Sequence, residues 1–405
     1  MKDDIFKWDP YSDQPYPIRD KALRKEIYKK TLYANIKLLL TNLLLSPIIL
    51  LAYPFTKYKR LDSLDRFFGM GISLGDDIEL IRELGIKDLF IRIPLSDIDD
   101  LEKYKEYINS LAEFRVVGNI LQDRSHIKDQ DLLKRDIKKI FKTLPLRSYQ
   151  IANAINRKKW AFFSMDEYLG FYKTIQDIRD ESFQDIKLYG SSVIDFEYHY
   201  TIRTLFNLYK IRYDRFSSLL YVDRRGSPEN KQLGFDLRSK IRLLYTLLRL
   251  SKKSPSKIVI TETNWPIIDT APYAPTSQKE CVDLDSYTLY MILYHLLAIS
   301  TGMVETIYWH QLIAKGYGLI DETNQKKYPS FQAYKIMVKL LKDKRLIEYD
   351  LSGDKRYMHF RGLHESLKIY WSYKGLDIKE DAKILNIYGK EYSGENFAYI
   401  LSDLV

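Results

Sequence analysis

The sequence has little that would hold a metal ion or a disulfide. Its 405 residues include one cysteine, Cys281, which excludes an intramolecular disulfide framework and a cysteine-based zinc site. The six histidines include no HExxH pair or comparable spacing. The segment "GMGISLG", residues 69 to 75, lacks the GxGxxG spacing of a dinucleotide-binding loop. We therefore expect no metal and no other cofactor.

The chain carries an excess of positive charge. Lysine and arginine number 64 against 54 acidic residues, so the net charge is +10. Such an excess favours an anionic partner: a membrane surface, a phosphorylated glycolipid or a nucleic acid. The basic residues are scattered among acidic ones, and no zinc-finger or RNA-binding signature is present. We therefore expect no nucleic-acid partner.

One segment near the start of the chain is almost wholly apolar. Residues 34–55, "ANIKLLLTNLLLSPIILLAYPF", approach the lower limit for a membrane span, contain Pro47 and have basic flanks. The segment lies too far from Met1 for an ordinary cleaved signal peptide. A hydrophobic helix packed on the domain is the alternative. We predict that residues 1–60 are a basic, membrane-associating segment, and the pattern leaves open whether its helix spans the bilayer or lies in one leaflet.

From Arg66 onwards, short apolar strands alternate with helical patterns. Eight strands can be counted, and most are followed by a helix, which predicts a TIM (β/α)8 barrel over residues 66–345. The pattern then changes to short aromatic strands such as "LKIYWSY" and "AKILNIYGK". These predict a small antiparallel β-sandwich over residues 346–405.

In such a barrel the active site is built at the C-terminal ends of the strands. The residues predicted there are polar, aromatic and rich in carboxylates, which suits a carbohydrate cleft. A tryptophan at a strand end is often only core, and the "DRRG" charges could belong to a solvated turn; otherwise these arginines suit a phosphate or an acidic sugar. The candidates are Arg92, Asn153, Asn156, Glu197, His199, Tyr221, Asp223, Arg224, Arg225, Glu229, Glu262, Asn264, Trp265, Trp309, His310 and Gln311.

Two of these strand ends resemble a known family. "IVITETNWP" and "YQIANAIN" resemble the strand-seven and strand-four signatures of the large clan of retaining glycoside hydrolases that bear two catalytic glutamates. "FIRIPL" and "IYWHQL" match the clan's strand-two arginine and strand-eight tryptophan, here Arg92 and Trp309. The resemblance covers about residues 66 to 400. It implies a (β/α)8 fold, a carbohydrate substrate and Glu262 as the nucleophile.

The sequence departs from the clan pattern at one position. Asn153 matches the asparagine of the strand-four signature, so Ala154 stands where the acid/base glutamate is expected. Retaining hydrolysis needs a second carboxylate about 5 Å from the nucleophile, and its proton transfers contribute about 10²–10⁴ in rate. Three accounts remain: the leaving group needs no proton, the barrel only holds a glycan, or the proton comes from a neighbouring strand, from Glu197, His199, Asp223 or Glu229.

The sequence thus predicts a glycoside hydrolase-like protein at the bacterial inner membrane, on either face. Its expected substrate is a glycolipid or polysaccharide precursor of the cell envelope, such as lipopolysaccharide or a polyprenyl-linked glycan. The expected reaction is hydrolysis or transglycosylation with Glu262 as nucleophile. The alternative is a catalytically degenerate glycan-binding or scaffold subunit in lipopolysaccharide or polysaccharide biosynthesis.

Overall fold

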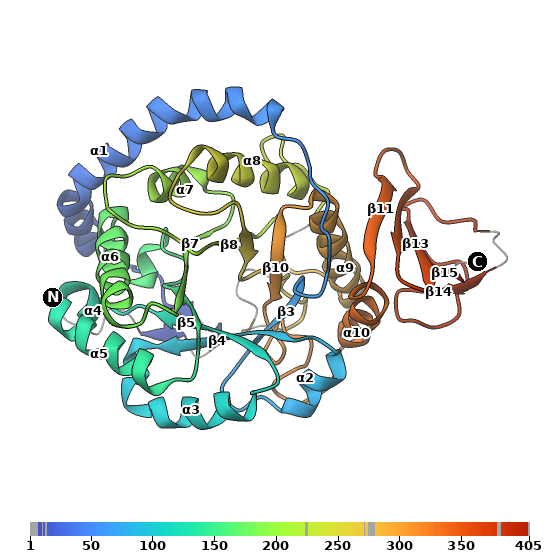
Figure 1. The fold of residues 1–405 in the computed structure, drawn as a ribbon, viewed down its shortest axis with the longest axis horizontal. Helices are drawn as coiled ribbons and strands as arrows, with labels where there is room; N and C mark the ends of the chain where they lie inside the picture. Colours follow the sequence, from blue (N-terminus) through green and yellow to red (C-terminus); the bar gives the residue numbers. More distant parts are fainter. Residues whose placement is uncertain are drawn as a thin grey trace.

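The computed structural model of the chain shows a closed barrel with a separate sheet beside it (Figure 1). It describes residues 7–9, 11–12, 14–222, 226–270, 272–273, 280–378 and 382–403.

Eight parallel strands close into a barrel in the order β10-β3-β4-β5-β6-β7-β8-β9. The first strand pairs with the last, with Phe68 opposite Ile307. The strands are largely buried apolar runs, as expected for a parallel sheet covered on both faces. This confirms the predicted (β/α)8 barrel. The strands are β3 (Phe68–Ile72), β4 (Asp88–Pro94), β5 (Arg115–Leu121), β6 (Ser148–Ile151), β7 (Lys187–Ile194), β8 (Arg215–Leu219), β9 (Ile258–Ile260) and β10 (Val304–Trp309).

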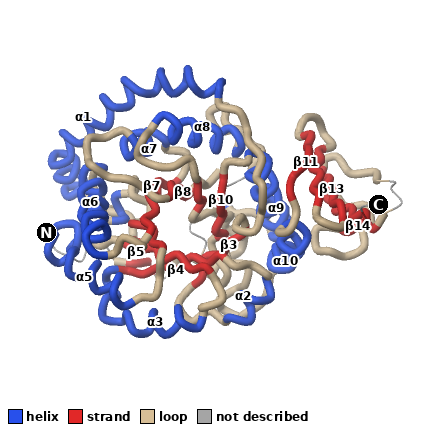
Figure 2. Tube along the Cα trace, in the orientation of Figure 1, coloured by secondary structure: helices blue, strands red, loops and turns tan. Residues whose placement is uncertain are grey.

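Helices surround the barrel as an outer ring (Figure 2). Several begin at a side chain that accepts hydrogen bonds from the first turn: Asp77, Asp129, Ser164, Asp236 and Asp283 are such N-caps. The α-helices of the ring are α2 (Ile78–Leu84), α3 (Leu101–Ser110), α4 (Arg124–Lys128), α5 (Gln130–Thr143), α6 (Met165–Ser182), α7 (Tyr198–Leu205), α8 (Leu237–Leu250), α9 (Leu284–Thr301) and α10 (Pro329–Leu341). Short 3-10 helices are η2 (Tyr53–Phe55), η3 (Leu95–Asp100) and η4 (Lys158–Trp160).

An apolar layer fills part of the barrel interior. Phe90, Val117, Tyr189, Val259 and Tyr308 form one buried cluster contributed by five strands. Successive inward positions on a strand are two residues apart, so the next inward positions include polar residues such as Arg92 on β4 and Asn119 on β5. The barrel therefore changes from an apolar floor to a polar upper layer as its strands approach their C-terminal ends.

The C-terminal residues form an antiparallel sheet in the order β11-β12-β13-β15-β14. One of its faces is apolar, since Met358, Phe360, Leu367, Ile369 and Trp371 are all buried. The predicted antiparallel domain is present, and its described strands make one five-stranded sheet rather than the two layers of a sandwich. The strands are β11 (Arg345–Asp350), β12 (Arg356–Arg361), β13 (Glu365–Trp371), β14 (Lys383–Leu385) and β15 (Phe397–Asp403).

Before the barrel, the chain forms a short hairpin and one long helix. The hairpin pairs β1 (Trp8–Asp9) with β2 (Gln14–Pro15). The helix α1 (Lys21–Ala52) crosses the outside of the barrel over α6, α7 and α8 (Figure 1). Within α1, Pro47 does not end the helix.

Helix α1 has two different faces. One face packs on the barrel through the buried Leu23, Ile27 and Ile49, while Lys37 pairs with Asp166 at 2.9 Å. The other face is apolar and exposed. Lys21–Phe55 is long and apolar enough to cross a membrane, a test that a core helix or a signal sequence also passes. The exposed apolar side chains from this region are Tyr28, Leu32, Tyr33, Ile36, Leu39, Leu40, Leu43, Leu44, Ile48, Leu50, Leu51 and Phe55.

The packing of α1 predicts a contrast between two of its residues. Ile49 is 3% exposed and Leu51 is 73% exposed. We expect Ile49→Ala to lower the free energy of unfolding by about 2–4 kcal/mol, since it leaves a cavity, and Leu51→Ala to change it by about 0.5 kcal/mol or less. Urea unfolding followed by circular dichroism, with both variants in the same mild detergent, measures the difference. Equal effects would mean that α1 is not held against the barrel.

Candidate active site

A buried carboxylate lies at the C-terminal ends of the strands. Glu262, just after β9, is 8% exposed. Its Oε1 accepts a hydrogen bond from the Tyr221 hydroxyl at 2.7 Å, and its Oε2 accepts from Asn153 Nδ2 at 3.3 Å. The Arg92 guanidinium completes the set at 3.1 Å from Oε2. Four residues singled out in the sequence thus converge from the ends of β4, β6, β8 and β9.

The surroundings of Glu262 keep it ionised. Burial opposes the charge, but the positive fields of His310 and Arg92 and the hydrogen bonds from Tyr221 and Asn153 outweigh it, so the pKa of Glu262 is lowered. His310 Nε2 also lies 3.4 Å from the Arg92 guanidinium. An ionised carboxylate with fixed partners is the state in which a glutamate can act as a nucleophile.

Asn153 is held by a network of buried amides. Its backbone N–H donates to Gln122 Oε1 at 2.9 Å, and Gln122 Nε2 donates to the Asn153 carbonyl at 2.8 Å. Gln150 Nε2 contacts both Asn119 Oδ1 at 3.3 Å and Asn153 Oδ1 at 3.4 Å. Asn119 and Gln150 were not among the predicted site residues. The sequence feature that could have indicated them is an amide side chain within an otherwise apolar strand.

The neighbour of Asn153 presents no polar group. Ala154 is fully buried, has φ 44°, and packs in one apolar cluster with Leu121, Trp160, Leu219 and Tyr221. The wall of the site at residue 154 is therefore hydrocarbon and aromatic ring, and the residue itself cannot donate a proton.

Other predicted carboxylates have different partners. Glu197 accepts from Asn156 Nδ2 at 2.7 Å and from Arg157 at 2.6 Å. Glu229 faces the C-terminal sheet, where it pairs with Arg356 at 3.0 Å and accepts from the Tyr373 hydroxyl at 2.8 Å.

Two further sets of predicted residues lie elsewhere. The His199 side chain is exposed at the start of α7, and burial of part of its ring lowers its pKa. Its carbonyl accepts from Asn42 of α1 at 2.9 Å. Asp223, Arg224 and Arg225 lie outside the described residues, so their predicted roles stay predictions.

The predicted tryptophans lie beneath the site. Trp265 and Trp309 are 1% and 0% exposed, with ring centroids 6.1 Å apart in a stacked arrangement. Trp309 Nε1 donates to the Tyr287 hydroxyl at 2.9 Å, and Asn264 Nδ2 donates to the His310 carbonyl at 2.6 Å. These contacts fix the ends of β9 and β10 next to Glu262. The substrate contacts predicted for both rings stay untested.

The N-terminal hairpin lies over this end of the barrel. Trp8 packs edge-on against Trp160 with centroids 5.4 Å apart, and Lys159 Nζ donates to Gln14 Oε1 at 2.5 Å. A cavity of about 330 Å³ lies between the hairpin and the strand ends and is lined by Trp8, Arg92 and Gln311. Sequence reasoning missed this cover, because no local pattern shows where the hairpin docks.

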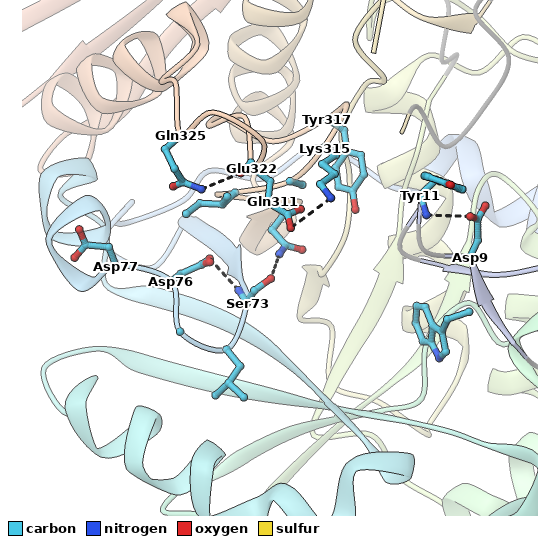
Figure 3. Close-up of a pocket in the computed structure, with 15 residues that line it drawn as sticks. Asp9, Tyr11, Ser73, Asp76, Asp77, Gln311, Lys315, Tyr317, Glu322 and Gln325 are labelled. Atoms are coloured by element: carbon cyan, nitrogen blue, oxygen red, sulfur yellow. Dashed lines mark hydrogen bonds and ion pairs between the residues drawn. The ribbon is translucent and has the colours of Figure 1, made fainter. Parts of the chain in front are cut away.

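A larger cavity of about 630 Å³ adjoins it (Figure 3). Asp76 lines the cavity and accepts from the Ser73 N–H at 2.9 Å, while the Gln311 amide donates to the Ser73 hydroxyl. Lys315 and Glu322 also line the cavity and form a 4.0 Å ion pair. Among the residues that the structure describes, no cluster of three or more His, Cys, Asp or Glu side chains could hold a metal ion.

The fold and the site define a (β/α)8 barrel with an ionised carboxylate at the C-terminal ends of its strands. No protein-family model and no curated protein sequence matches the chain. Its structural neighbours are glycoside hydrolases. A family 39 glycoside hydrolase from Bacteroides cellulosilyticus WH2 aligns with a TM-score of 0.58 and 13% identity over 85% of this chain and 80% of that one.

Two further neighbours have the same character. A family 30 endoxylanase from Clostridium papyrosolvens C71 aligns with a TM-score of 0.56 and 10% identity, covering 86% of this chain and 98% of that one. A β-xylosidase from Caulobacter crescentus CB15 aligns with a TM-score of 0.53 and 10% identity, covering 80% and 77%. At these identities the comparison establishes the shared fold.

Asp76 gives a testable pH dependence. Burial, with repulsion from Glu322, raises the pKa of Asp76 to about 7, despite the hydrogen bond from Ser73. The folded protein therefore holds a proton that the unfolded chain releases near pH 4, and stability falls as the pH rises from about 4 to about 7. Asp76→Asn removes this loss. We expect the variant to gain about 2–4 kcal/mol of unfolding free energy over the wild type across that range.

Urea unfolding at pH values from about 4.5 to 7.5 measures the difference between Asp76→Asn and the wild type. The control is Asp343→Asn, which removes an exposed carboxylate; its difference from the wild type should stay nearly constant. A constant difference for Asp76→Asn as well would show that Asp76 is ionised throughout.

Proposed function

We propose that the chain is a glycoside hydrolase-like enzyme in which Glu262 attacks the anomeric carbon of a bound sugar. The observation that carries the proposal is the ionised, buried Glu262 carboxylate held by Arg92, Asn153 and Tyr221. A carboxylate fixed at the C-terminal ends of the strands is positioned where such barrels do their chemistry. The shared fold of the structural neighbours supports the same class of substrate, a carbohydrate.

The hydrocarbon wall at Ala154 suggests which leaving group this site accepts. Loss of proton donation costs about 3–5 kcal/mol of barrier, and a leaving group that is already stable as an anion does not need it. In the first step a Glu262 oxygen bonds to the anomeric carbon, and the bond to the phosphate or diphosphate oxygen breaks with its electron pair. The oxygen of water or of a sugar hydroxyl then bonds to the anomeric carbon, the bond to Glu262 breaks and releases its carboxylate, and the O–H proton passes to the released phosphate or to solvent, which gives hydrolysis or transglycosylation.

Helix α1 supports a place at a membrane. Leu32, Ile36, Leu39 and Leu43 recur at spacings of four, three and four on its exposed face, so they form one stripe. Lys37, on the same helix, is held to Asp166 of the barrel. A helix with one face on the barrel and an apolar face outward suits insertion into a single leaflet. We propose that it holds the enzyme at the bacterial inner membrane, next to a glycolipid or polysaccharide precursor of the cell envelope.

The second candidate is a glycan-binding or scaffold subunit without catalysis. The observation that favours it concerns the described partners of Glu262: Arg92, Asn153, Tyr221 and His310 are cationic or neutral, and none of these four is a second carboxylate. In this alternative Glu262 and Arg92 would bind sugar hydroxyls. The two candidates differ in whether any donor is turned over.

Donor substrates test the catalytic proposal. We expect glycosyl phosphates or fluorides to be turned over at least about 100-fold faster than alkyl glycosides of the same sugar, since only the latter need a proton donor. Glu262→Gln should abolish both activities. Azide, which attacks without a general base, should accelerate the second step and yield a glycosyl azide. Initial rates and product analysis by mass spectrometry measure both effects.

A matched variant separates the alternatives. Glu197→Gln removes a carboxylate that contacts Asn156 and Arg157, and it should leave the ratio between the two donor types unchanged. If alkyl glycosides react as fast as activated donors and Glu197→Gln slows only them, Glu197 is a substitute acid. If no donor reacts and glycan binding survives Glu262→Gln, the scaffold alternative holds.

Membrane attachment can be measured by vesicle flotation. Changing Leu32, Ile36, Leu39 and Leu43 to serine should weaken binding to lipid vesicles by about 100-fold or more, because four apolar side chains no longer enter the bilayer. The matched control changes the exposed Leu208, Leu233 and Leu363, which lie outside α1, and should bind like the wild type. If the wild type, the α1 variant and the control variant bind vesicles equally, α1 is not the anchor.

A further inference from the structure

A basic groove lies between the start of α1 and the connection that follows β6. Its volume is about 860 Å³, and one wall carries Lys21, Arg24 and Lys25 of α1. Arg157, Lys158 and Lys159 line the other wall. No aspartate or glutamate is among the residues that line it. Positive side chains thus converge from two segments that are far apart in the sequence.

In the described part of the chain, two of the six basic side chains that line the groove have partners. Arg157 pairs with Asp195 at 2.5 Å and with Glu197 at 2.6 Å, and Lys159 donates to Gln14 and lies in the field of Asp9. Within the described part of the chain, Lys21, Arg24, Lys25 and Lys158 form no ion pair with a carboxylate.

The two walls repel each other. Burial and the positive field of Arg24 across the groove both lower the pKa of Lys158. Like charges held this close destabilise the folded chain until an anion comes between them. The groove is therefore a positively charged recess whose electrostatics and shape suit an anion.

The groove lies between the two parts of the molecule on which the proposed function depends. Asn153, which donates to Glu262, precedes Arg157 by four residues, so their Cα atoms are separated by at most about 15 Å. On α1, Tyr28 lines the groove, and Leu32 of the exposed apolar stripe follows one turn later. An anion in the groove is thus close to both the candidate active site and the lipid-facing helix surface.

We propose that this groove binds the phosphoryl group of a membrane lipid. Guanidinium and ammonium groups form charge-assisted hydrogen bonds to phosphate oxygens, and the adjoining leucine stripe suits the acyl or prenyl chains of the same molecule. The proposal rests on the proposed function for one point only, the placement of α1 against a bilayer. In that function the groove holds the phosphate of the lipid-linked glycan whose sugar reaches Glu262.

The test uses the full-length protein and phosphatidic acid, which carries a phosphoryl group and no sugar, so the result does not depend on catalysis. Binding to phosphatidylcholine vesicles is compared with binding to the same vesicles containing phosphatidic acid. The ratio of the two dissociation constants measures the recognition of phosphate. Inorganic pyrophosphate, added as a competitor, tests whether a soluble phosphate binds in the same groove.

Two groove variants and one matched control are compared. Arg24→Gln with Lys25→Gln, and separately Lys158→Gln, remove charge from opposite walls of the groove. Lys29→Gln with Lys30→Gln removes two charges from the same helix outside the groove. We expect the double groove variant to lose at least about tenfold more of the phosphatidic-acid preference than the control does. Lys158→Gln should lose several-fold, and phosphatidylcholine binding should stay unchanged in all variants.

Two other outcomes would overturn the groove proposal, and a third would overturn only the proposed function. If the groove and control variants lose the phosphatidic-acid preference equally, the preference comes from the general charge of α1, and the groove is not a specific site. Groove-dependent binding of pyrophosphate without a groove-dependent preference for phosphatidic acid would make the ligand a soluble phosphate and overturn the lipid source. If the protein turns over no donor while its preference for phosphatidic acid is intact, the proposed function is wrong and the groove proposal holds.

Discussion

The structure depends on the compensation of one buried carboxylate. Glu262 is stable as an ion inside the barrel because Arg92 lies 3.1 Å from it and Tyr221 and Asn153 donate hydrogen bonds to it. A buried carboxylate without such partners would take up a proton. The partners come from β4, β6 and β8, so they meet only when the barrel closes. Closure of the fold and ionisation of the site are therefore coupled.

The sequence predicted the parts of the molecule that local patterns determine. Apolar runs such as Ile258–Ile260 alternate with amphipathic helices, and this period is enough to give the barrel. The residues around Glu262 could be predicted as neighbours because all the parallel strands of a barrel end at one face. Partners set by tertiary packing were out of reach. Nothing near Glu229 predicts its pairing with Arg356, and nothing near Trp8 predicts its contact with Trp160.

Helix α1 shows why an apolar pattern can be ambiguous. Apolar residues surround most of its circumference, so the sequence could not tell a membrane helix from a core helix. The structure has features of both, because Ile49 is buried against the barrel while Leu51 points outward. The polar residues inside the apolar segment decide which face packs: Lys37 reaches Asp166, and Asn42 reaches the His199 carbonyl. Turning these groups toward lipid would leave them unpaired in hydrocarbon.

The apolar residue at position 154 and the cations near it favour the same chemistry in the proposed function. A proton donor serves to neutralise charge that develops on a leaving oxygen. Fixed positive charge can stabilise the same oxygen when it belongs to a phosphate, since the charge is already delocalised and cations bind it directly. Ala154 is followed within four residues by Lys158 of the basic groove. In the proposed function, a segment with an apolar residue at position 154 and a groove lysine four residues later suits a site in which electrostatic stabilisation takes the place of proton transfer.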